Sequence, residues 1–283
     1  MNEVSVLRAG PLTTVQDRGR PGFAHLGVPP SGAADPQALE LGNRIVGNDP
    51  GAAALEATLL GPALRFVEPA LVAVTGAEAT VSVSGQPLEH GALGEVPAGG
   101  VLEIGRCRHG VRSYLCIRGG VAVEATLGSC SHDLLTGLGP PPLRDGNVLL
   151  VGSEPASPPQ HAPTVIVSPP AEPVLRVLPG PRDDWFPPEA LAALVEVTWR
   201  VGSASNRVGI RLEGPPLARV DRGELLSEGV VTGAIQVTPS GQPILLGPDH
   251  PTTGGYPVIA VVYTDDLPLA GQLAPGASVR FSI

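Results

Sequence analysis

The chain has 283 residues, 42% hydrophobic and only 3% aromatic, which is enough for one large or two ordinary domains with cores built mainly from Val, Leu, Ile and Ala. Its net charge of −9 argues against a general nucleic-acid binder, because such proteins need a basic surface. No apolar run is long enough to span a membrane, and charged residues interrupt the region where a secretory signal needs its apolar stretch. We therefore expect a cytoplasmic protein that binds neither nucleic acid nor membranes.

Short runs of strand-forming residues recur along the chain, with Gly and Pro between them as turns. Two short helices are predicted, one over 36–45 with Asp35 as N-cap and Gly47 after its end, the other over 189–195. The clearest predicted strands cover residues 71–75, 80–83, 113–118, 147–151, 164–167, 174–178 and 257–263. Because the strands are too many and too short for βαβ units, the pattern predicts a mainly β fold.

The best linker candidate runs from Gly152 to Pro163, where Pro and Ser residues disfavour both helix and central strand. It predicts domains at 1–152 and 164–283. Two short motifs recur in the same order in both halves: NRIVG at 43–47 with NRVG at 206–209, and SGQPL at 84–88 with SGQPI at 240–244. They favour a tandem of two similar barrels or sandwiches, although SGQP is also ordinary turn chemistry.

Several kinds of chemistry are missing from the sequence. All 18 basic residues are Arg, so a P-loop lysine, a Schiff-base lysine and a biotinyl-lysine are excluded on this chain. The GxSxG and HExxH motifs are absent, and the three Cys residues lack CxxC spacing. We therefore expect no metal site and ordinary free thiols.

Three segments carry more polar groups than a turn needs. The first contains Gln16, Asp17 and Arg20 between glycines, where Arg can bind a carboxylate or phosphate with two hydrogen bonds. The alternative is a turn-rich loop in which Asp17 and Arg20 pair with each other. The second contains Asn206 and Arg207, and here too pairing of the Arg with an acid is the alternative to anion binding.

The third segment, 247–257, contains Asp249, His250 and Tyr256 before a strongly apolar strand. His250 is a candidate base near neutral pH, with Asp249 orienting it or acting as a base itself. The alternative is a strand-entry turn. If the first and third segments are exposed loops that share a cleft, Arg20→Ala and Asp249→Ala should abolish activity while changing stability by only ~0.5 kcal/mol.

The motifs LTTVQDRGRPG, GVPPSGAAD, LGNRIVGND, SYLCIRGG, SNRVGIRL and GAIQVTPSGQPILLGPDHPTTGGYP occur in this order along essentially the whole chain. In this they resemble the carboxyltransferase C/A-subunit family, which includes the C subunit of 5-oxoprolinase, KipA-like proteins and allophanate hydrolase subunit 2. The resemblance implies two cyclophilin-like β-barrel domains in tandem with a few short helices.

The resemblance also implies a function exercised in a heteromeric complex. The favoured activity is ATP-dependent opening of 5-oxoproline to glutamate, with this chain as the C subunit acting beside an A-like subunit and a B-like or KipI-like subunit. The alternatives are a carboxyltransferase component acting on urea or allophanate with a biotin-dependent partner, and a non-catalytic KipA-like regulator. No covalently bound cofactor is expected, and ATP would be used by the complex rather than bound by this chain alone.

The reaction that the resemblance implies needs cations for the substrate carboxylate and phosphate and a base for water, and the residue roles are a hypothesis built on those needs. Asp17, Asp249 and His250 are the candidate catalytic residues. Arg20 and Arg207 would hold the anionic groups of a small-molecule substrate, and Gln16, Asn206 and Tyr256 would orient it.

Overall fold

The computed structural model describes residues 2–160 and 170–283 of the chain. The predicted strand at 164–167 and the last residues of the predicted linker lie outside these ranges. The chain divides into two compact units. The first comprises Met1–Arg20, Asp35–Asp133 and Gly137–Pro169, and the second comprises Pro21–Ala34, Leu134–Thr136 and Pro170–Ile283. Two short segments from the first half of the sequence therefore belong to the second unit.

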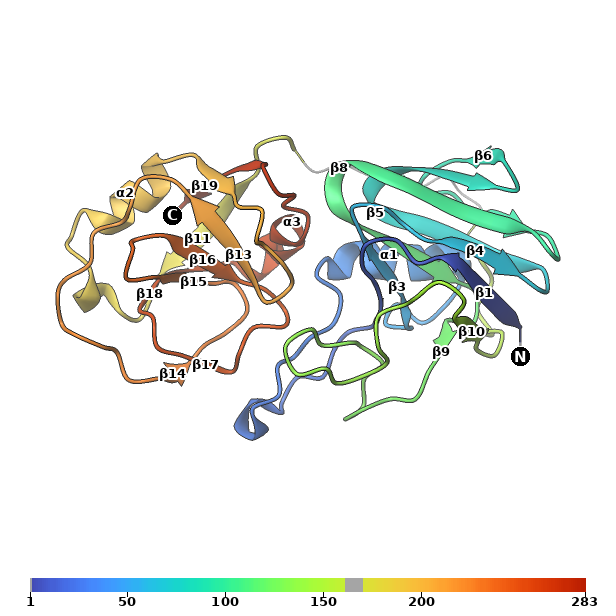
Figure 1. The fold of residues 1–283 in the computed structure, drawn as a ribbon, viewed down its shortest axis with the longest axis horizontal. Coiled ribbons are helices and arrows are strands. Elements are labelled where there is room, and N and C mark those ends of the chain that lie inside the picture. Colours follow the sequence, from blue (N-terminus) through green and yellow to red (C-terminus); the bar gives the residue numbers. More distant parts are fainter. Residues whose placement is uncertain (1, 161–169) are drawn as a thin grey trace. The chain divides into compact units, whose positions relative to one another are not determined.

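The first unit is built on a ten-stranded sheet with one helix (Figure 1). Its strand order is β2-β3-β8-β4-β1-β10-β9, and β5 pairs with β6, β7 and β8. The strands are β1 (Glu3–Arg8), β2 (Thr13–Gln16), β3 (Ala54–Thr58), β4 (Ala63–Phe66), β5 (Ala70–Val83), β6 (Gln86–Leu88), β7 (Gly94–Val96), β8 (Val101–Ile117), β9 (Val121–Ala122) and β10 (Val148–Val151).

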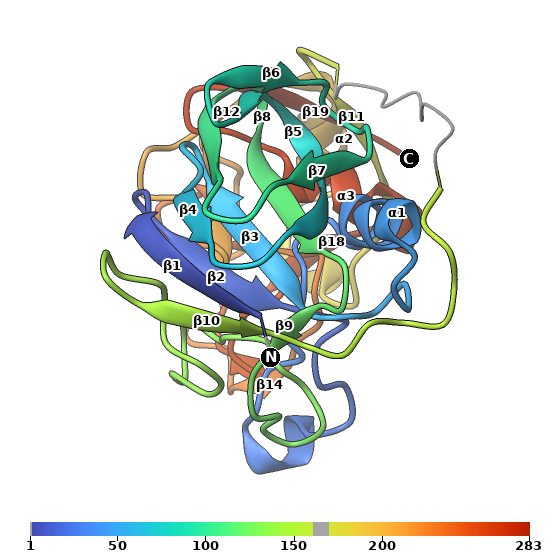
Figure 2. The ribbon, with the colours of Figure 1, turned by 90° about the vertical axis from the view of Figure 1, so that its right-hand side faces the viewer.

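The helix of the first unit, α1 (Pro36–Val46), begins and ends as its sequence predicts. The Asp35 carboxylate accepts a hydrogen bond from the Ala38 amide at 3.0 Å, and Gly47 closes the helix with φ of 77°. α1 lies against β5 and β8 (Figure 2), with Leu39 among its buried residues, and the Thr75 hydroxyl donates to the Ala38 carbonyl at 2.7 Å. The apolar core of the unit includes Val74 of β5 and Leu115 of β8, together with Val15 of β2 and Leu55 of β3.

The second unit contains a closed seven-stranded barrel in the order β11-β18-β15-β16-β13-β12-β19. Its strands are β11 (Val174–Pro179), β12 (Trp199–Val201), β13 (Gly209–Glu213), β15 (Ala234–Val237), β16 (Pro243–Leu246), β18 (Val258–Val262) and β19 (Ser278–Ser282), and β14 (Glu228–Gly229) with β17 (Thr253–Gly254) forms a separate ribbon. The helices are α2 (Ala190–Glu196) and α3 (Leu267–Gly271), with 3-10 turns η1 (Ala24–Leu26), η2 (Asp183–Trp185) and η3 (Thr264–Asp266).

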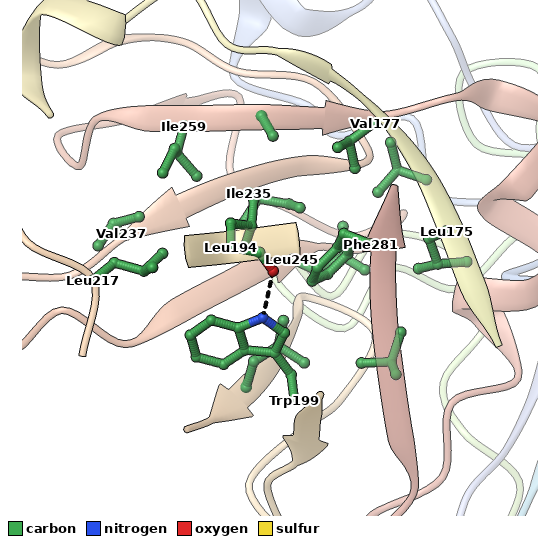
Figure 3. Packing of buried hydrophobic residues seen from close by; sticks show 14 of the residues in the cluster. Leu175, Val177, Leu194, Trp199, Leu217, Ile235, Val237, Leu245, Ile259 and Phe281 are labelled. Carbon is green, nitrogen blue, oxygen red and sulfur yellow. Dashed lines mark hydrogen bonds between the residues drawn. The ribbon is translucent and has the colours of Figure 1, made fainter. Parts of the chain in front are cut away.

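The barrel of the second unit is filled by β-branched, Leu and aromatic side chains (Figure 3). Trp199 is fully buried, and its indole N–H donates to the Leu194 carbonyl at 2.9 Å, which ties α2 to the barrel wall. Both tryptophans, Trp185 and Trp199, are buried in this unit. Tryptophan fluorescence therefore reports on the second unit alone.

The predicted fold class, mainly β with two barrels and a few short helices, is confirmed. Two predicted strands, 71–75 and 80–83, are one continuous strand, β5, whose pairing with β8 shifts register between Gly76 and Val81. The Gly that marked an end in the sequence lies at a bulge instead. No helix within the described residues is long and apolar enough to cross a membrane.

The two internal echoes have different structural outcomes. Both SGQP motifs form turns between paired strands, with Gly85 and Gly241 at φ of 80°. In contrast, Asn43 is a buried residue within α1, whereas Asn206 lies in a turn before β13. The NR echo therefore does not mark equivalent positions.

Candidate functional site

Asp17 follows β2 and binds the loop at residues 129–131, which is distant in sequence, through hydrogen bonds. Its Oδ1 accepts hydrogen bonds from the hydroxyls of Ser129 and Ser131, both at 2.6 Å, and from the Gly19 amide at 2.7 Å. Its Oδ2 accepts from the Cys130 amide at 2.6 Å. The Asp17 amide in turn donates to the Ser131 hydroxyl at 2.9 Å. A carboxylate with four donors is held firmly in its loop, so the contacts favour a positioning role over that of a mobile base.

Arg20 is the second residue of this loop cluster and is 1% exposed. Its Nε donates to the Thr126 carbonyl at 3.2 Å, and Nη2 donates to the Ser131 carbonyl. Nη1 is buried and has no hydrogen-bond partner in the part of the chain that the structure describes. Neither contact is to a carboxylate, so Arg20 does not pair with Asp17 directly. A buried cation with an unused donor is costly unless an acceptor fills the position.

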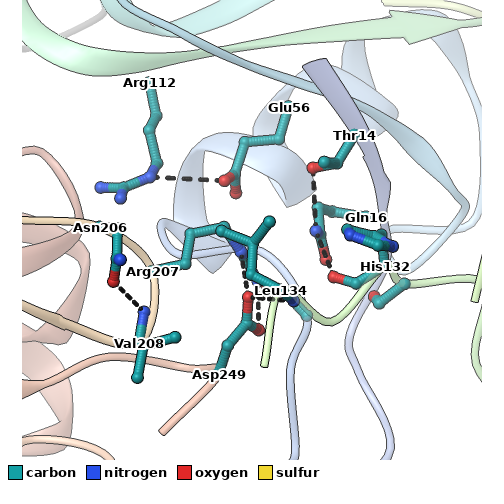
Figure 4. Close-up of polar contacts among 12 residues, drawn as sticks. Thr14, Gln16, Glu56, Arg112, His132, Leu134, Asn206, Arg207, Val208 and Asp249 are labelled. Atoms are coloured by element: carbon teal, nitrogen blue, oxygen red, sulfur yellow. Dashed lines mark hydrogen bonds and ion pairs between the residues drawn. The ribbon is translucent and has the colours of Figure 1, made fainter. Parts of the chain in front are cut away.

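Gln16 is fully buried at the end of β2. Its amide nitrogen donates to the Thr14 hydroxyl at 3.0 Å and to the His132 carbonyl at 2.9 Å (Figure 4). Its Oε1 has no partner within the described residues. Gln16 and Arg20 thus bind consecutive carbonyls, those of His132 and Ser131. Each has one polar atom without a partner in the described residues: Gln16 Oε1 is an acceptor and Arg20 Nη1 is a donor.

The outer face of the sheet carries a polar row that sequence reasoning missed. Cross-strand register places Thr14 of β2, Glu56 of β3 and Tyr114 of β8 side by side. The Tyr114 hydroxyl donates to Glu56 Oε2 at 2.7 Å. Arg112 Nε lies 3.4 Å from Glu56 Oε1 (Figure 4). Burial, followed by the charge of Glu56, raises the pKa of Tyr114 well above its usual range, so the phenol stays protonated. The sequence signal that could have revealed this row is the presence of Glu56 and Tyr114 within otherwise apolar strand segments.

In the second unit, Arg207 and Asp249 form a buried ion pair. Arg207 Nε lies 2.7 Å from Asp249 Oδ2 and Nη2 lies 2.9 Å from Oδ1 (Figure 4). Nη2 also donates to the Gly32 carbonyl at 2.6 Å. Asp249 Oδ2 further accepts from the Leu134 amide at 3.1 Å. The two residues, assigned separate roles by sequence reasoning, are therefore each other's partners. The acid pairing that was the alternative for Arg207 is what the structure contains.

The Asp249 carboxyl is held as an anion. Burial alone would raise its pKa, but the Arg207 charge, together with hydrogen bonds from Arg207, Leu134 and Ser31, outweighs burial and lowers the pKa. A carboxylate with a lowered pKa and a bidentate guanidinium partner is a weak proton acceptor near neutral pH.

The remaining candidates of the second unit differ in burial and in their contacts. His250 is buried, and its Nδ1 lies 2.7 Å from the Pro251 carbonyl, which can only accept, so Nδ1 carries the proton. Asn206 is exposed, and its side chain accepts from the Val208 amide at 2.8 Å, as expected of a turn residue. Tyr256 is 41% exposed after β17. Among the described residues, no group of three or more His, Cys, Asp or Glu side chains is placed to hold a metal ion.

The expectation that Arg20 and Asp249 lie in exposed loops is wrong, because they are 1% and 0% exposed. The error came from equating Gly- and Pro-rich sequence with surface position. Substitutions at these sites remove buried polar contacts and should change stability by more than the ~0.5 kcal/mol of an exposed position.

The contacts of Asp17 predict that its loss destabilises the first unit. Asp17→Ala leaves four donors without their acceptor, and we expect a loss of about 2–4 kcal/mol with faster hydrogen exchange at the Cys130 amide. Asp17→Asn retains one carbonyl oxygen and should lose about half as much. Hydrogen exchange read by mass spectrometry over residues 126–132 measures both. If Asp17→Asn instead abolishes activity while hydrogen exchange over residues 126–132 is unchanged, Asp17 acts as a base and does not serve to hold the loop in place.

Comparison with known proteins decides the family. The model of the carboxyltransferase domain, subdomain A and B, matches residues 26–283. The chain belongs to this carboxyltransferase family. It is 37% identical to the 5-oxoprolinase C subunit of Escherichia coli over 98% of this chain and 90% of that protein, and 33% identical to the corresponding Haemophilus influenzae subunit with the same coverage. It is also 36% identical to urea amidolyase of Saccharomyces cerevisiae, of which it covers 16%.

Two solved structures share this fold. The crystal structure of TTHA0988 has a TM-score of 0.90 and 36% identity, and the K. lactis urea amidolyase has a TM-score of 0.91 and 32% identity. The two matches cover 100% and 99% of this chain, respectively, but this chain spans only 56% and 18% of those two chains. The same fold therefore occurs as part of longer polypeptides.

Proposed function

We propose that this chain is the C subunit of an ATP-dependent 5-oxoprolinase complex, which opens 5-oxoproline to glutamate together with A-like and B-like subunits. The observation that carries the proposal is the match to the Escherichia coli 5-oxoprolinase C subunit, at 37% identity over 90% of that protein. The correspondence extends over nearly the full length of both chains. The match to the Saccharomyces cerevisiae urea amidolyase has a similar identity, 36%, but covers only 16% of that much longer chain.

The chemistry defines what a subunit of such a complex must bind. A lactam carbonyl is a poor electrophile because the nitrogen lone pair is delocalised into it. Phosphoryl transfer from ATP to the lactam oxygen activates the carbon, water adds there, and the protonated ring nitrogen leaves. The resulting acyl phosphate is hydrolysed by a second water to glutamate and phosphate. The substrate carboxylate and the phosphoryl group require cations, and water requires a base.

The first unit contains groups suited to the anionic substrate. Arg20 Nη1 is an unused, buried donor for a carboxylate or phosphoryl oxygen, and Gln16 Oε1 is an unused, buried acceptor for a ring N–H. We assign Arg20 and Gln16 to substrate binding. Asp17 keeps their loop in place. The role of His250 as a base stays a prediction, and Asp249 fixes Arg207 rather than abstracting a proton.

ATP binding is assigned to the assembled complex, because the chain has no lysine for a P-loop. We expect the purified chain alone to hydrolyse neither ATP nor 5-oxoproline, and a mixture with its A-like and B-like partners to release glutamate only when ATP is present. Coupled glutamate detection measures this, with each subunit omitted in turn as the control. Turnover by the single chain would contradict the proposal.

The second candidate is a carboxyltransferase role with a biotin-dependent partner, favoured by 37% identity to Lachancea kluyveri urea amidolyase over 98% of this chain. Carboxylation of urea in the presence of such a partner, without glutamate release from 5-oxoproline, would select it. A mixture that forms a stable complex yet has neither activity would select a KipA-like regulator.

A further inference from the structure

The first unit has a pocket that none of the candidate site residues lines. Its volume is about 540 Å³, and its lining includes Arg8 of β1, Thr80 of β5, Leu88 of β6 and Glu103 of β8. Sites for small molecules usually measure about 300–1,000 Å³, so the pocket has room for a metabolite. Its lining combines the exposed Glu103, on the face of β8 opposite Leu102 and Ile104, with Val81 of the apolar core.

Irregular strand pairing surrounds this pocket. The register of β5 against β8 shifts three times between Gly76 and Val81, and that of β1 against β4 shifts between Val6 and Arg8. Leu59, next to the lining residue Leu60, has φ of 67°, which is unusual for a branched side chain. Bulges and strained residues concentrate beside functional sites, where they redirect side chains.

Two opposite charges line the pocket without pairing. Arg8 Nη2 reaches only the carbonyls of Gly61 and Ile104, at 3.4 and 3.5 Å, and its buried Nε has no partner in the described ranges. Within the same ranges neither Arg8 nor Glu103 forms an ion pair. Register explains why: Arg8 pairs with Ala63, which pairs with Glu103, so two strand spacings, about 10 Å, separate their backbones.

We propose that this pocket binds a zwitterionic α-amino acid. Arg8 binds the carboxylate, Glu103 binds the ammonium group, and the side chain of the ligand lies against Leu60, Val81 and Leu88. An anion alone fits less well, because Glu103 would repel it, and a cation alone would be repelled by Arg8. The ligand bridges the two charges.

Calorimetric titration of the purified chain with L-leucine tests the proposal. L-leucine has both charges and an aliphatic side chain. We expect saturable binding of L-leucine, and at least tenfold weaker binding of 4-methylpentanoate, which lacks the ammonium group, and of 3-methylbutylamine, which lacks the carboxylate. Absence of L-leucine binding up to about 10 mM would overturn the proposal. So would equal binding of either analogue.

Variants place the binding in this pocket. Arg8→Gln and Glu103→Gln should each weaken L-leucine binding at least tenfold, whereas Arg65→Gln and Glu3→Gln, on neighbouring strands and exposed, should not. Arg8→Lys keeps the charge and should retain part of the affinity. It replaces Arg8→Gln as the test variant if Arg8→Gln folds poorly. Binding that survives both Arg8→Gln and Glu103→Gln refutes the assignment. This result is independent of 5-oxoprolinase activity, which is measured on the mixed subunits.

Discussion

Asp249→Ala is expected to destabilise the second unit by about 3–5 kcal/mol, because it removes the bidentate carboxylate partner of the buried Arg207 guanidinium. Arg207 would keep only the Gly32 carbonyl among the contacts shown for its Nη2 atom. Urea denaturation followed by tryptophan fluorescence measures the effect, because Trp185 and Trp199 both lie in this unit.

A matched double variant separates loss of the pair from loss of packing. Arg207→Met combined with Asp249→Leu removes both charges and should recover most of the stability that Asp249→Ala loses. If the double variant is as unstable as Asp249→Ala, the pair is not the source of the effect. If Asp249→Ala retains wild-type stability, the carboxylate is not structurally required.

The same pair predicts a pH dependence. The pKa of Asp249 is lowered in the folded state from its ordinary value of 3.8, so its contribution to stability is complete above that value. The contribution falls as pH drops through the lower, folded-state pKa. Asp249→Asn should therefore flatten the acid limb of the stability curve of the second unit, while leaving its shape above about pH 5 unchanged.

Arg20→Met is expected to lower the activity of the assembled complex by about 100-fold or more while changing stability by less than about 1 kcal/mol. A buried guanidinium with an unused donor costs folding energy, and Met fills a similar volume without a charge. The cost is recovered only when an anion occupies Nη1. Steady-state kinetics on the mixed subunits, with thermal unfolding of the same samples, measures both quantities.

Two controls define the meaning of the Arg20 result. Arg20→Lys keeps a charge but not the fork of donors, and it should fall between the wild type and Arg20→Met in activity. Arg18→Met removes an exposed arginine two residues away and should change neither quantity. A large loss of stability in Arg20→Met with normal activity would show that Arg20 only fastens its loop.

Local structure could be predicted well from the sequence, whereas side-chain pairing could not. The ends of α1 follow from Asp35, Pro36 and Gly47, which act within a few residues. The Cys130 amide that Asp17 binds is 113 residues away, and the partners of Arg207 and Glu56 are 42 and 58 residues away. These contacts depend on strand register and loop path, which no local pattern encodes. The same gap explains why Glu56, Arg112 and Tyr114 were missed.

The composition of the second unit has a consequence for how the gene can be divided. A coding region for residues 170–283 supplies the barrel strands but omits Pro21–Ala34 and Leu134–Thr136. With them go the Gly32 carbonyl that Arg207 binds, the Leu134 amide that Asp249 accepts from, and the Ser31 amide that binds the Pro248 carbonyl. The second unit is thus encoded by three separate stretches of the gene. A truncation or recombination that separates residues 170–283 from the other two stretches removes backbone groups that bind Arg207 and Asp249.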